Sequence, residues 1–246
     1  MIEAKNLHFS YGGREVLRGI DFKAEAGEFV AILGPNGAGK STFLRCLAGI
    51  LKCSRVGLDG RPLTDYFPRE LSKILAYVPQ RIESNFLTVF DTVLLGRKPY
   101  MGLTPSERDL RIVEDSLKRL GIEKLALKMT NEISGGELQK VSIARALAQE
   151  PKILLMDEPT NNLDLKSQLE VMRLARELSK EGRTVITVMH DVNLALRFAK
   201  RFIFMKDGRI VADGGLEGLN ERLFEKVYSV RVEIGEIKGV PIVVPI

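Results

Sequence analysis

Short apolar runs along the chain alternate with segments of helical periodicity. The runs cover residues 29–33, 75–78, 153–156 and 184–188. Continuous apolar strands that alternate with helices are typical of a parallel sheet covered on both faces. The pattern therefore predicts an α/β fold with a mostly parallel central sheet. The runs 202–205 and 209–211, separated by Lys206-Asp207-Gly208, predict a hairpin.

The N-terminal part of the chain has a different pattern. Leu7, Phe9 and Tyr11 alternate with polar residues, as in a half-buried strand. Gly12-Gly13 then predicts a turn into a second strand over 16–22, antiparallel to the first. Val56-Gly57-Leu58, followed by Asp59-Gly60, predicts a short edge strand. We expect these strands to form an antiparallel β lobe.

The middle of the chain, residues 86–150, predicts only helices. Thr104-Pro105-Ser106-Glu107 is interpreted as a capping box with proline at the first helical position. The helix that follows has apolar residues at helical spacing and ends at Gly121; they are Leu110, Val113, Leu117 and Leu120. A further helix over 165–178 ends at Gly182. The segments within 86–150 predict a helical subdomain inserted into the sheet domain, whereas the helix over 165–178 belongs to the α/β pattern that follows it.

Composition limits the kind of protein. The 246 residues carry a formal net charge of +5, and basic residues are scattered among acidic ones. Because nucleic-acid sites need clustered basic residues, we expect no nucleic-acid partner. Cys46 and Cys53 indicate structural thiols in a reducing compartment. No apolar run approaches the roughly 20 residues that cross a bilayer, and the first residues lack a signal-peptide pattern, so we expect any membrane association to come through a partner.

One glycine-rich segment carries the strongest chemical signal. It matches the phosphate-binding pattern G-x-x-x-x-G-K-[ST] at every required position, between a predicted strand and a helix that ends at Gly49. Glycines let backbone N–H groups approach phosphate oxygens, and the helix N-terminus adds partial positive charge. A plain glycine-rich turn is the alternative. The expected nucleotide-binding residues are Gly34, Pro35, Asn36, Gly37, Ala38, Gly39, Lys40, Ser41 and Thr42. Lys40 is expected to reach the β- and γ-phosphates, and Ser41 to bind Mg²⁺.

Two acidic residues end the strand over 153–156. Asp157 and Glu158 would lie at the carboxyl edge of a parallel sheet, where such folds bind ligands. Acids that merely cap a strand are the alternative. With a phosphate loop upstream, we expect Asp157 to position Mg²⁺, through water, and Glu158 to polarise the water that attacks the γ-phosphate.

A second candidate anion site lies at Ser134-Gly135-Gly136. A serine followed by two glycines at a helix start can bind an anion. One nucleotide does not need two such sites from one chain. We therefore expect this segment to cap a nucleotide held by a second copy.

With these motifs in this order, nearly the whole chain resembles the ATP-binding-cassette family. The resemblance implies a single nucleotide-binding domain over 1–246, with a P-loop NTPase core at 1–85 and 151–215, a helical subdomain at 86–150 and an extension at 216–246. It implies ATP and Mg²⁺ as cofactors, a homodimer with ATP between the copies, permease subunits as partners, an indirect substrate-binding protein, and a peripheral location on the cytoplasmic side of the membrane.

The resemblance also assigns single residues. Tyr11 is similar to the adenine-stacking aromatic, Gln80 to the loop glutamine that contacts Mg²⁺ and the membrane partner, and His190 to the switch histidine on the γ-phosphate. Tyr11 and His190 could instead be structural, and Gln80 alone carries no signal. The signature reads Ile-Ser-Gly-Gly-Glu where Leu-Ser-Gly-Gly-Gln is commoner, and the dimer loop Asn162-Leu163-Asp164 starts with asparagine instead of serine. The catalytic set is therefore Glu158, His190, Lys40 and Gln80, and the metal set is Ser41, Gln80 and Asp157.

The resemblance favours an importer subunit. The stretch 87–100, with Gly96-Arg97-Lys98-Pro99, and the tail over 223–245 are similar to cassettes that serve ferric siderophore, haem and cobalamin importers, so we expect iron complexes first and cobalamin second. We expect an apolar groove with Arg97 and Lys98 as its polar rim to receive the permease. A soluble single-cassette ATPase, as in iron–sulfur cluster assembly, stays open as the alternative. A small-molecule kinase would leave Ser134-Gly135-Gly136 unexplained.

Overall fold

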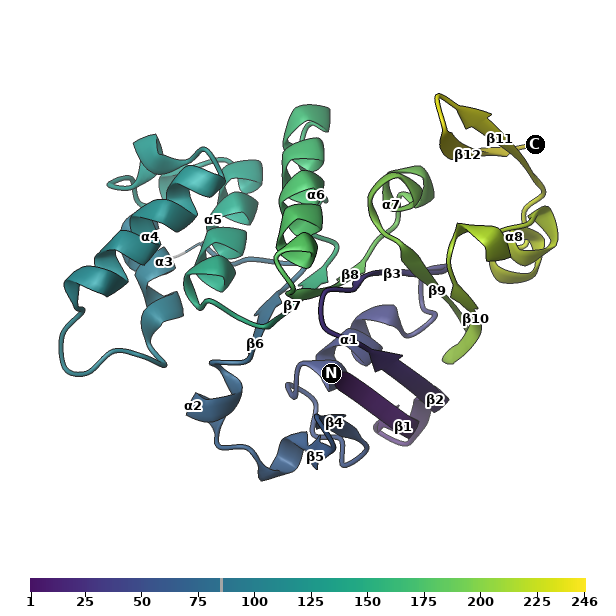
Figure 1. Ribbon diagram of the computed structural model, residues 1–246, viewed down its shortest axis with the longest axis horizontal. Coiled ribbons are helices and arrows are strands. Elements are labelled where there is room, and N and C mark those ends of the chain that lie inside the picture. The colour runs from purple at the N-terminus through teal and green to yellow at the C-terminus, as the bar shows by residue number, and fades with distance from the viewer. Residues whose placement is uncertain (85) are drawn as a thin grey trace.

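The computed structural model describes residues 1–84 and 86–246 and places a six-stranded sheet at the centre of the molecule (Figure 1). Its order is β10-β9-β3-β8-β7-β6, and only β10 runs antiparallel to its neighbour. The strands are β3 (Phe29–Leu33), β6 (Leu75–Val78), β7 (Ile153–Asp157), β8 (Thr184–Val188), β9 (Arg201–Lys206) and β10 (Arg209–Gly214). The predicted α/β fold with a mostly parallel sheet is confirmed.

Two smaller sheets accompany it. A four-stranded antiparallel sheet has the order β2-β1-β4-β5, from β1 (Ile2–Tyr11), β2 (Arg14–Ala24), β4 (Val56–Leu58) and β5 (Arg61–Pro62). The predicted edge position of β4 was wrong, because β4 pairs with β1 on one side and with β5 on the other. A C-terminal hairpin consists of β11 (Val232–Ile237) and β12 (Val240–Pro245).

The helices cover both faces of the central sheet. In Figure 1, α6 and α7 lie on one face and α1 on the other, while α3, α4 and α5 form a group at one end. The α-helices are α1 (Lys40–Leu47), α2 (Pro68–Leu71), α3 (Val89–Leu94), α4 (Glu107–Arg119), α5 (Gly135–Ala148), α6 (Leu165–Lys180), α7 (Val192–Phe198) and α8 (Glu221–Tyr228). Short 3-10 turns occupy Leu63–Asp65, Leu95–Arg97, Glu123–Leu125, Thr130–Glu132 and Leu216–Gly218.

Strand β3 separates two apolar cores. Phe29, Ala31 and Leu33 pack into the core formed with α3 to α8, whereas Val30 and Ile32 pack into the core formed with α1 and the antiparallel sheet. Successive strand residues face opposite sides of a sheet, so a strand between two cores is apolar throughout. This explains why the run over 29–33 does not alternate with polar residues.

The start of α4 corrects one prediction. The capping residue is Ser106, whose hydroxyl accepts a hydrogen bond from the Asp109 N–H at 3.2 Å, while the Asp109 carboxylate accepts one from the Ser106 N–H at 3.0 Å. Pro105 therefore precedes the helix, and Thr104 is not part of the cap. Both Thr-x-x-Glu and Ser-x-x-Asp fit a cap pattern in the sequence, and the extended backbone at Ser106 decides between them.

Arg97 lies inside the helical group and not on a polar rim, so that prediction was wrong. Its side chain is 2 % exposed. The guanidinium donates to Asp109 at 2.9 Å, to the Ala148 carbonyl at 2.8 Å and to Glu150 at 2.8 Å. Together with the hydrogen bonds from Ser106, which contribute most, Arg97 lowers the pKa of Asp109 to about 2. Arg97 thus joins the turn after α3 to α4 and to the end of α5.

We expect Arg97→Ala to lower the free energy of unfolding by about 3–5 kcal/mol, because it leaves the Asp109 carboxylate buried without its cation. Arg61→Ala is the matched control. Arg61 also pairs with a glutamate, Glu70 at 2.8 Å, and lies over a tyrosine ring, but its side chain is 44 % exposed. It should cost less than about 1 kcal/mol. Urea unfolding measures both, and equal losses in the two variants would contradict a special role for Arg97.

Candidate functional site

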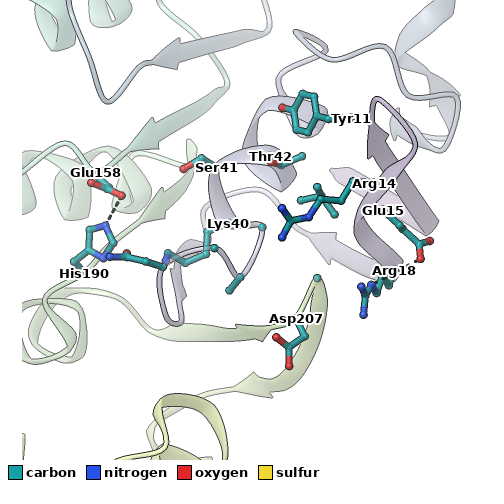
Figure 2. Close-up of a pocket in the computed structure, with 16 residues that line it drawn as sticks. Tyr11, Arg14, Glu15, Arg18, Lys40, Ser41, Thr42, Glu158, His190 and Asp207 are labelled. Carbon is teal, nitrogen blue, oxygen red and sulfur yellow. Dashed lines mark hydrogen bonds and ion pairs between the residues drawn. The ribbon is translucent and has the colours of Figure 1, made fainter.

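The carboxyl ends of β3, β7 and β8 meet at one edge of the sheet and border a cavity of about 750 Å³ (Figure 2). The polar side chains around the cavity come from β1 and β2, from the loop after β3, from the ends of β7 and β8, and from the turn between β9 and β10. They include Tyr11, Arg14, Lys40, Ser41, Thr42, Glu158, His190 and Asp207. The site therefore combines the central sheet with the antiparallel sheet.

The loop between β3 and α1 is held by close backbone contacts. Gly34 has a φ of 146°, and a Cβ atom at this position would lie 2.1 Å from the Met205 carbonyl oxygen. Only glycine fits there. The Lys40 ammonium donates to the carbonyl oxygens of Gly34 at 2.7 Å and of Pro35 at 3.0 Å. Burial lowers the pKa of Lys40. The loop thus folds around its own cation at the floor of the cavity.

Asp157 ends β7 in a fully buried position. Its carboxylate accepts hydrogen bonds from the Ser41 hydroxyl at 2.8 Å and from the Tyr77 hydroxyl at 3.2 Å. Burial raises the pKa of Asp157, and these two hydrogen bonds oppose the rise. Burial also raises the pKa of Tyr77 to about 12, so its hydroxyl stays a donor at neutral pH. The first turn of α1 is thereby tied to β7.

Glu158 turns out of the strand into the cavity. Its φ of 52° is left-handed, which turns the chain sharply at this residue, and its side chain is 6 % exposed. The carboxylate accepts from the Gln80 amide at 2.5 Å and from the Asn161 amide. It also contacts His190 Nε2 (Figure 2). Residues after three different strands, β6, β7 and β8, therefore converge on one carboxylate.

Two of the predicted site segments lie elsewhere or at the rim. The Tyr11 side chain is 45 % exposed at the cavity rim, with its ring edge-on to Phe9 at 4.9 Å between centroids. Ser134 caps α5, followed by Gly135 and Gly136, and the cavity-lining residues of the described chain do not include this segment. The structure brings together the predicted phosphate loop, Asp157 and Glu158, Gln80 and His190. The second glycine-rich segment does not border this cavity.

Comparison with known families identifies the chain. Residues 17–161 match the family model described as ABC transporter. This chain belongs to the ABC transporter family. Its motifs and the geometry of the cavity agree with that assignment along the length of the match.

Two relatives in the ABC family match this chain over almost their whole length. An uncharacterized ABC transporter ATP-binding protein of Methanocaldococcus jannaschii is 51 % identical over 249 residues, covering 100 % of this chain and 98 % of the relative. The hemin import ATP-binding protein HmuV of Mesorhizobium japonicum is 37 % identical, again covering 100 % of this chain and 98 % of the relative. The chain is thus the ATP-binding subunit of an ABC transporter.

Solved structures agree with the fold and the activity. A dimeric ATP-binding cassette in a post-hydrolysis state with ADP and Pi is 34 % identical, with a TM-score of 0.79 over 89 % of this chain and 100 % of that one. An inward-facing ABC transporter assigned to the metal-chelate type has a TM-score of 0.84 at 27 % identity, over 100 % of this chain and 96 % of that chain. The chain is an ABC ATPase that binds nucleotide. Within the described residues, no helix has the length and apolar character to span a membrane.

The residues around Asp157 fit a magnesium ion. Ser41 and Asp157 supply a hydroxyl and a carboxylate that already lie 2.8 Å apart, and Gln80 adds an amide group next to Glu158. Mg²⁺ prefers oxygen ligands and is held by few protein groups together with substrate phosphates and water. Such a site does not need a cluster of three or more acidic, histidine or cysteine side chains, and the described residues contain none.

Among the residues that the sequence did not single out are two that contact the acidic pair, Tyr77 and Asn161. Tyr77 lies inside an apolar strand pattern, where a tyrosine most simply indicates core packing, yet its hydroxyl binds Asp157 and also accepts from Arg45 Nε at 3.4 Å. Asn161 follows Glu158 by three residues, and its amide contacts that carboxylate. The polar run Thr160-Asn161-Asn162, separated from the acidic pair by Pro159, was a signal that could have indicated Asn161.

We propose Glu158 as the carboxylate that orients the attacking water, since three side chains fix its position beside Lys40. Glu158→Gln should bind ATP with near-native affinity but turn over at least ~100-fold more slowly, the scale of a lost acid–base group. Steady-state phosphate release and ATP binding measure this. The control is Glu170→Gln, which makes the same chemical change on α6, where Glu170 pairs with Lys140 of α5. It should keep wild-type turnover. Wild-type turnover in Glu158→Gln would remove Glu158 from the reaction.

Proposed function

We propose that this ABC ATPase energises the import of a metal chelate, with iron complexes such as haem or ferric siderophores first and cobalamin second. The supporting observation is the similarity to hemin import ATP-binding proteins, at 37 % identity over 98 % of the Mesorhizobium protein and 42 % identity over 83 % of the Deinococcus radiodurans protein. The structure assigned to the metal-chelate type covers the whole chain as well.

The proposed reaction is in-line attack of water on the γ-phosphate of ATP. Tyr11 stacks on the adenine, and the loop over 34–42 holds the phosphates with its N–H groups. Lys40 exchanges its carbonyl partners for phosphate oxygens, where it stabilises the developing charge. When bound through Ser41, Asp157 and Gln80, Mg²⁺ adds charge neutralisation at the phosphates. Glu158 orients the water, and His190 contacts the γ-phosphate.

The proposed partners are permease subunits, with the ATPase on the cytoplasmic face of the membrane and a substrate-binding protein acting on the far side. The stretch after the loop glutamine offers a partly exposed apolar surface for the permease. Leu87 and Leu95 are 38 % and 43 % exposed, and Phe90 and Leu94 are half-buried. Val89 and Val93 are fully buried and fill the core of the helical group. Fewer residues are therefore available for docking than the apolar pattern of the sequence indicates.

We also propose a head-to-tail dimer that encloses two nucleotides. The N-terminus of α5 has two glycines and a serine cap, yet the cavity-lining residues of the described chain exclude it. In a two-fold pair each surface serves both copies, so this helix start can cover the phosphates bound by the other copy. The dimeric ABC cassettes among the similar structures support this arrangement.

We expect the isolated protein to be monomeric without nucleotide and dimeric as Glu158→Gln with ATP, because the slow variant keeps the γ-phosphate between the copies. Light scattering of the variant with and without ATP measures this. Lys40→Ala, combined with Glu158→Gln, should abolish both ATP binding and the dimer. A strict monomer at saturating ATP would overturn the proposed dimer.

The cargo is tested by uptake. In a deletion strain, uptake of labelled haem or ferric siderophore should be lost, and complementation by wild type but not by Glu158→Gln should restore it. Cobalamin is measured in parallel. A transported molecule is recognised by its own site, which lies outside this chain, so the ATPase variants test coupling only. Undiminished uptake of all three chelates, with loss of a sugar or an amino acid, would place the protein in another branch of importers.

A further inference from the structure

The C-terminal extension takes no part in the site as described so far. After β10 the chain forms α8 and then the β11–β12 hairpin, which lies beside α7 in Figure 1. Helix α8 buries Phe224 and Val227 against the sheet domain. Two of its contacts with the rest of the molecule, at the end of β9 and on α7, lie next to segments that border the cavity.

The first place is the start of the phosphate loop. The Phe224 ring lies edge-on to Phe204 of β9 at 5.6 Å between centroids, and the Tyr228 ring stacks on Phe224 at 6.2 Å. Phe204 precedes Met205, whose carbonyl oxygen adjoins Gly34, the first residue of the loop. Burial raises the pKa of Tyr228 to about 12, so the phenol stays neutral.

The end of α8 is held against the same strand. The Lys206 ammonium, at the end of β9, donates to the Lys226 carbonyl at 2.6 Å and to the Ser229 hydroxyl at 3.4 Å. Met205, the neighbour of Lys206, places its carbonyl oxygen against Gly34 with no room for a side chain between them. The loop start is therefore enclosed between β9 and the last turn of α8.

The second place is the segment that carries His190. Asn193 on α7, three residues after His190, makes two hydrogen bonds to Val243 of the hairpin. Its amide donates to the Val243 carbonyl at 3.1 Å, and its oxygen accepts from the Val243 N–H at 2.8 Å. Between them, Asp191 caps α7 by accepting from the Leu194 N–H at 2.9 Å. The orientation of α7, and with it the loop of His190, is thus fixed from the hairpin.

We infer that the extension braces the nucleotide site at two points, with Lys206 as a positioning residue for the phosphate loop and Asn193 as a positioning residue for His190. The inference rests on the proposed role of His190 but not on the cargo. Because the brace holds the end of β9 that adjoins Gly34 and the helix after His190, it limits how far these two segments can separate. An extension that only adds stability would act on neither segment.

Two variants test the two contacts separately. Lys206→Met keeps the aliphatic part of the side chain and removes its two hydrogen bonds to the end of α8, and it should weaken ATP binding about fivefold, the scale of one hydrogen bond, with kcat near wild type. Asn193→Ala should lower kcat about tenfold with little change in ATP affinity. Asn193→Ser replaces it if the alanine variant is unstable. ATP titration, steady-state kinetics and urea unfolding are measured on the full chain.

The control is Gln149→Ala. Gln149 also donates to two backbone carbonyls, of Ser72 and Leu75, but at the start of β6, at the opposite edge of the sheet. It should lose stability without changing affinity or kcat. If Lys206→Met and Asn193→Ala behave like this control, with affinity and kcat within about twofold of wild type, the brace is refuted.

The histidines supply a direct structural readout. The chain has 2 histidines, His8 and His190, and His8 lies on β1, where its Nδ1 pairs with Glu15 at 2.8 Å. Imidazole NMR signals of Asn193→Ala should shift or broaden for His190 and stay unchanged for His8. Unchanged signals for both would refute the positioning of His190, even if the Glu158→Gln result supports the catalytic site itself.

Discussion

Strand β3 is buried along its whole length between two apolar cores. Polar side chains can therefore lie next to it only where the strand ends. The same constraint applies to β7 and β8, whose residues are also buried throughout. Because these strands are parallel, their carboxyl ends lie at one edge, and the polar residues that follow must gather there. The phosphate loop, Asp157, Glu158 and His190 are neighbours for this reason.

In the single chain, Lys40 and Glu158 are hydrogen-bonded to groups of the same chain. The Lys40 ammonium is satisfied by two loop carbonyls, and the Glu158 carboxylate by Gln80, Asn161 and His190. Buried charges are costly unless hydrogen-bonded, which explains why every charged group at the cavity floor has local partners. Of these groups, the Lys40 ammonium can exchange its two carbonyl partners for phosphate oxygens, whereas the Glu158 carboxylate is itself an acceptor and cannot bond to phosphate. The free energy of binding through Lys40 is therefore a difference between two hydrogen-bonded arrangements, and burial, which lowers the pKa of Lys40, opposes its charged form in the absence of a nearby anion.

The sequence predicted those parts of the fold and site whose chemistry is local. The phosphate loop needs glycine where the backbone passes close to Met205, and an apolar strand must precede it, so motif and context appear together in the sequence. Contacts between distant segments were not predictable in the same way. Whether Thr104 or Ser106 caps α4 depends on where the chain enters the helix, and whether Arg97 faces solvent depends on Asp109 and on the end of α5. The same holds for Tyr77, because its apolar neighbours in the sequence give no sign of the hydrogen bond that its hydroxyl makes to Asp157.

The substitution of glutamate for the commoner glutamine in the signature has a physical consequence for the proposed dimer. The Glu137 carboxylate accepts from both the N–H and the hydroxyl of Ser134, each at 2.8 Å, and the N–H bond is the first cause of its lowered pKa. In the single chain, the serine hydroxyl is therefore already committed to an anion. A phosphate from the other copy would have to replace that carboxylate as the acceptor while a negative charge stays one helical turn away. The carboxylate favours the N-terminus of α5 and at the same time opposes a second anion there. The cap that stabilises this helix in the monomer thus raises the cost of closing the dimer, and closure depends more strongly on the contacts made by ATP itself.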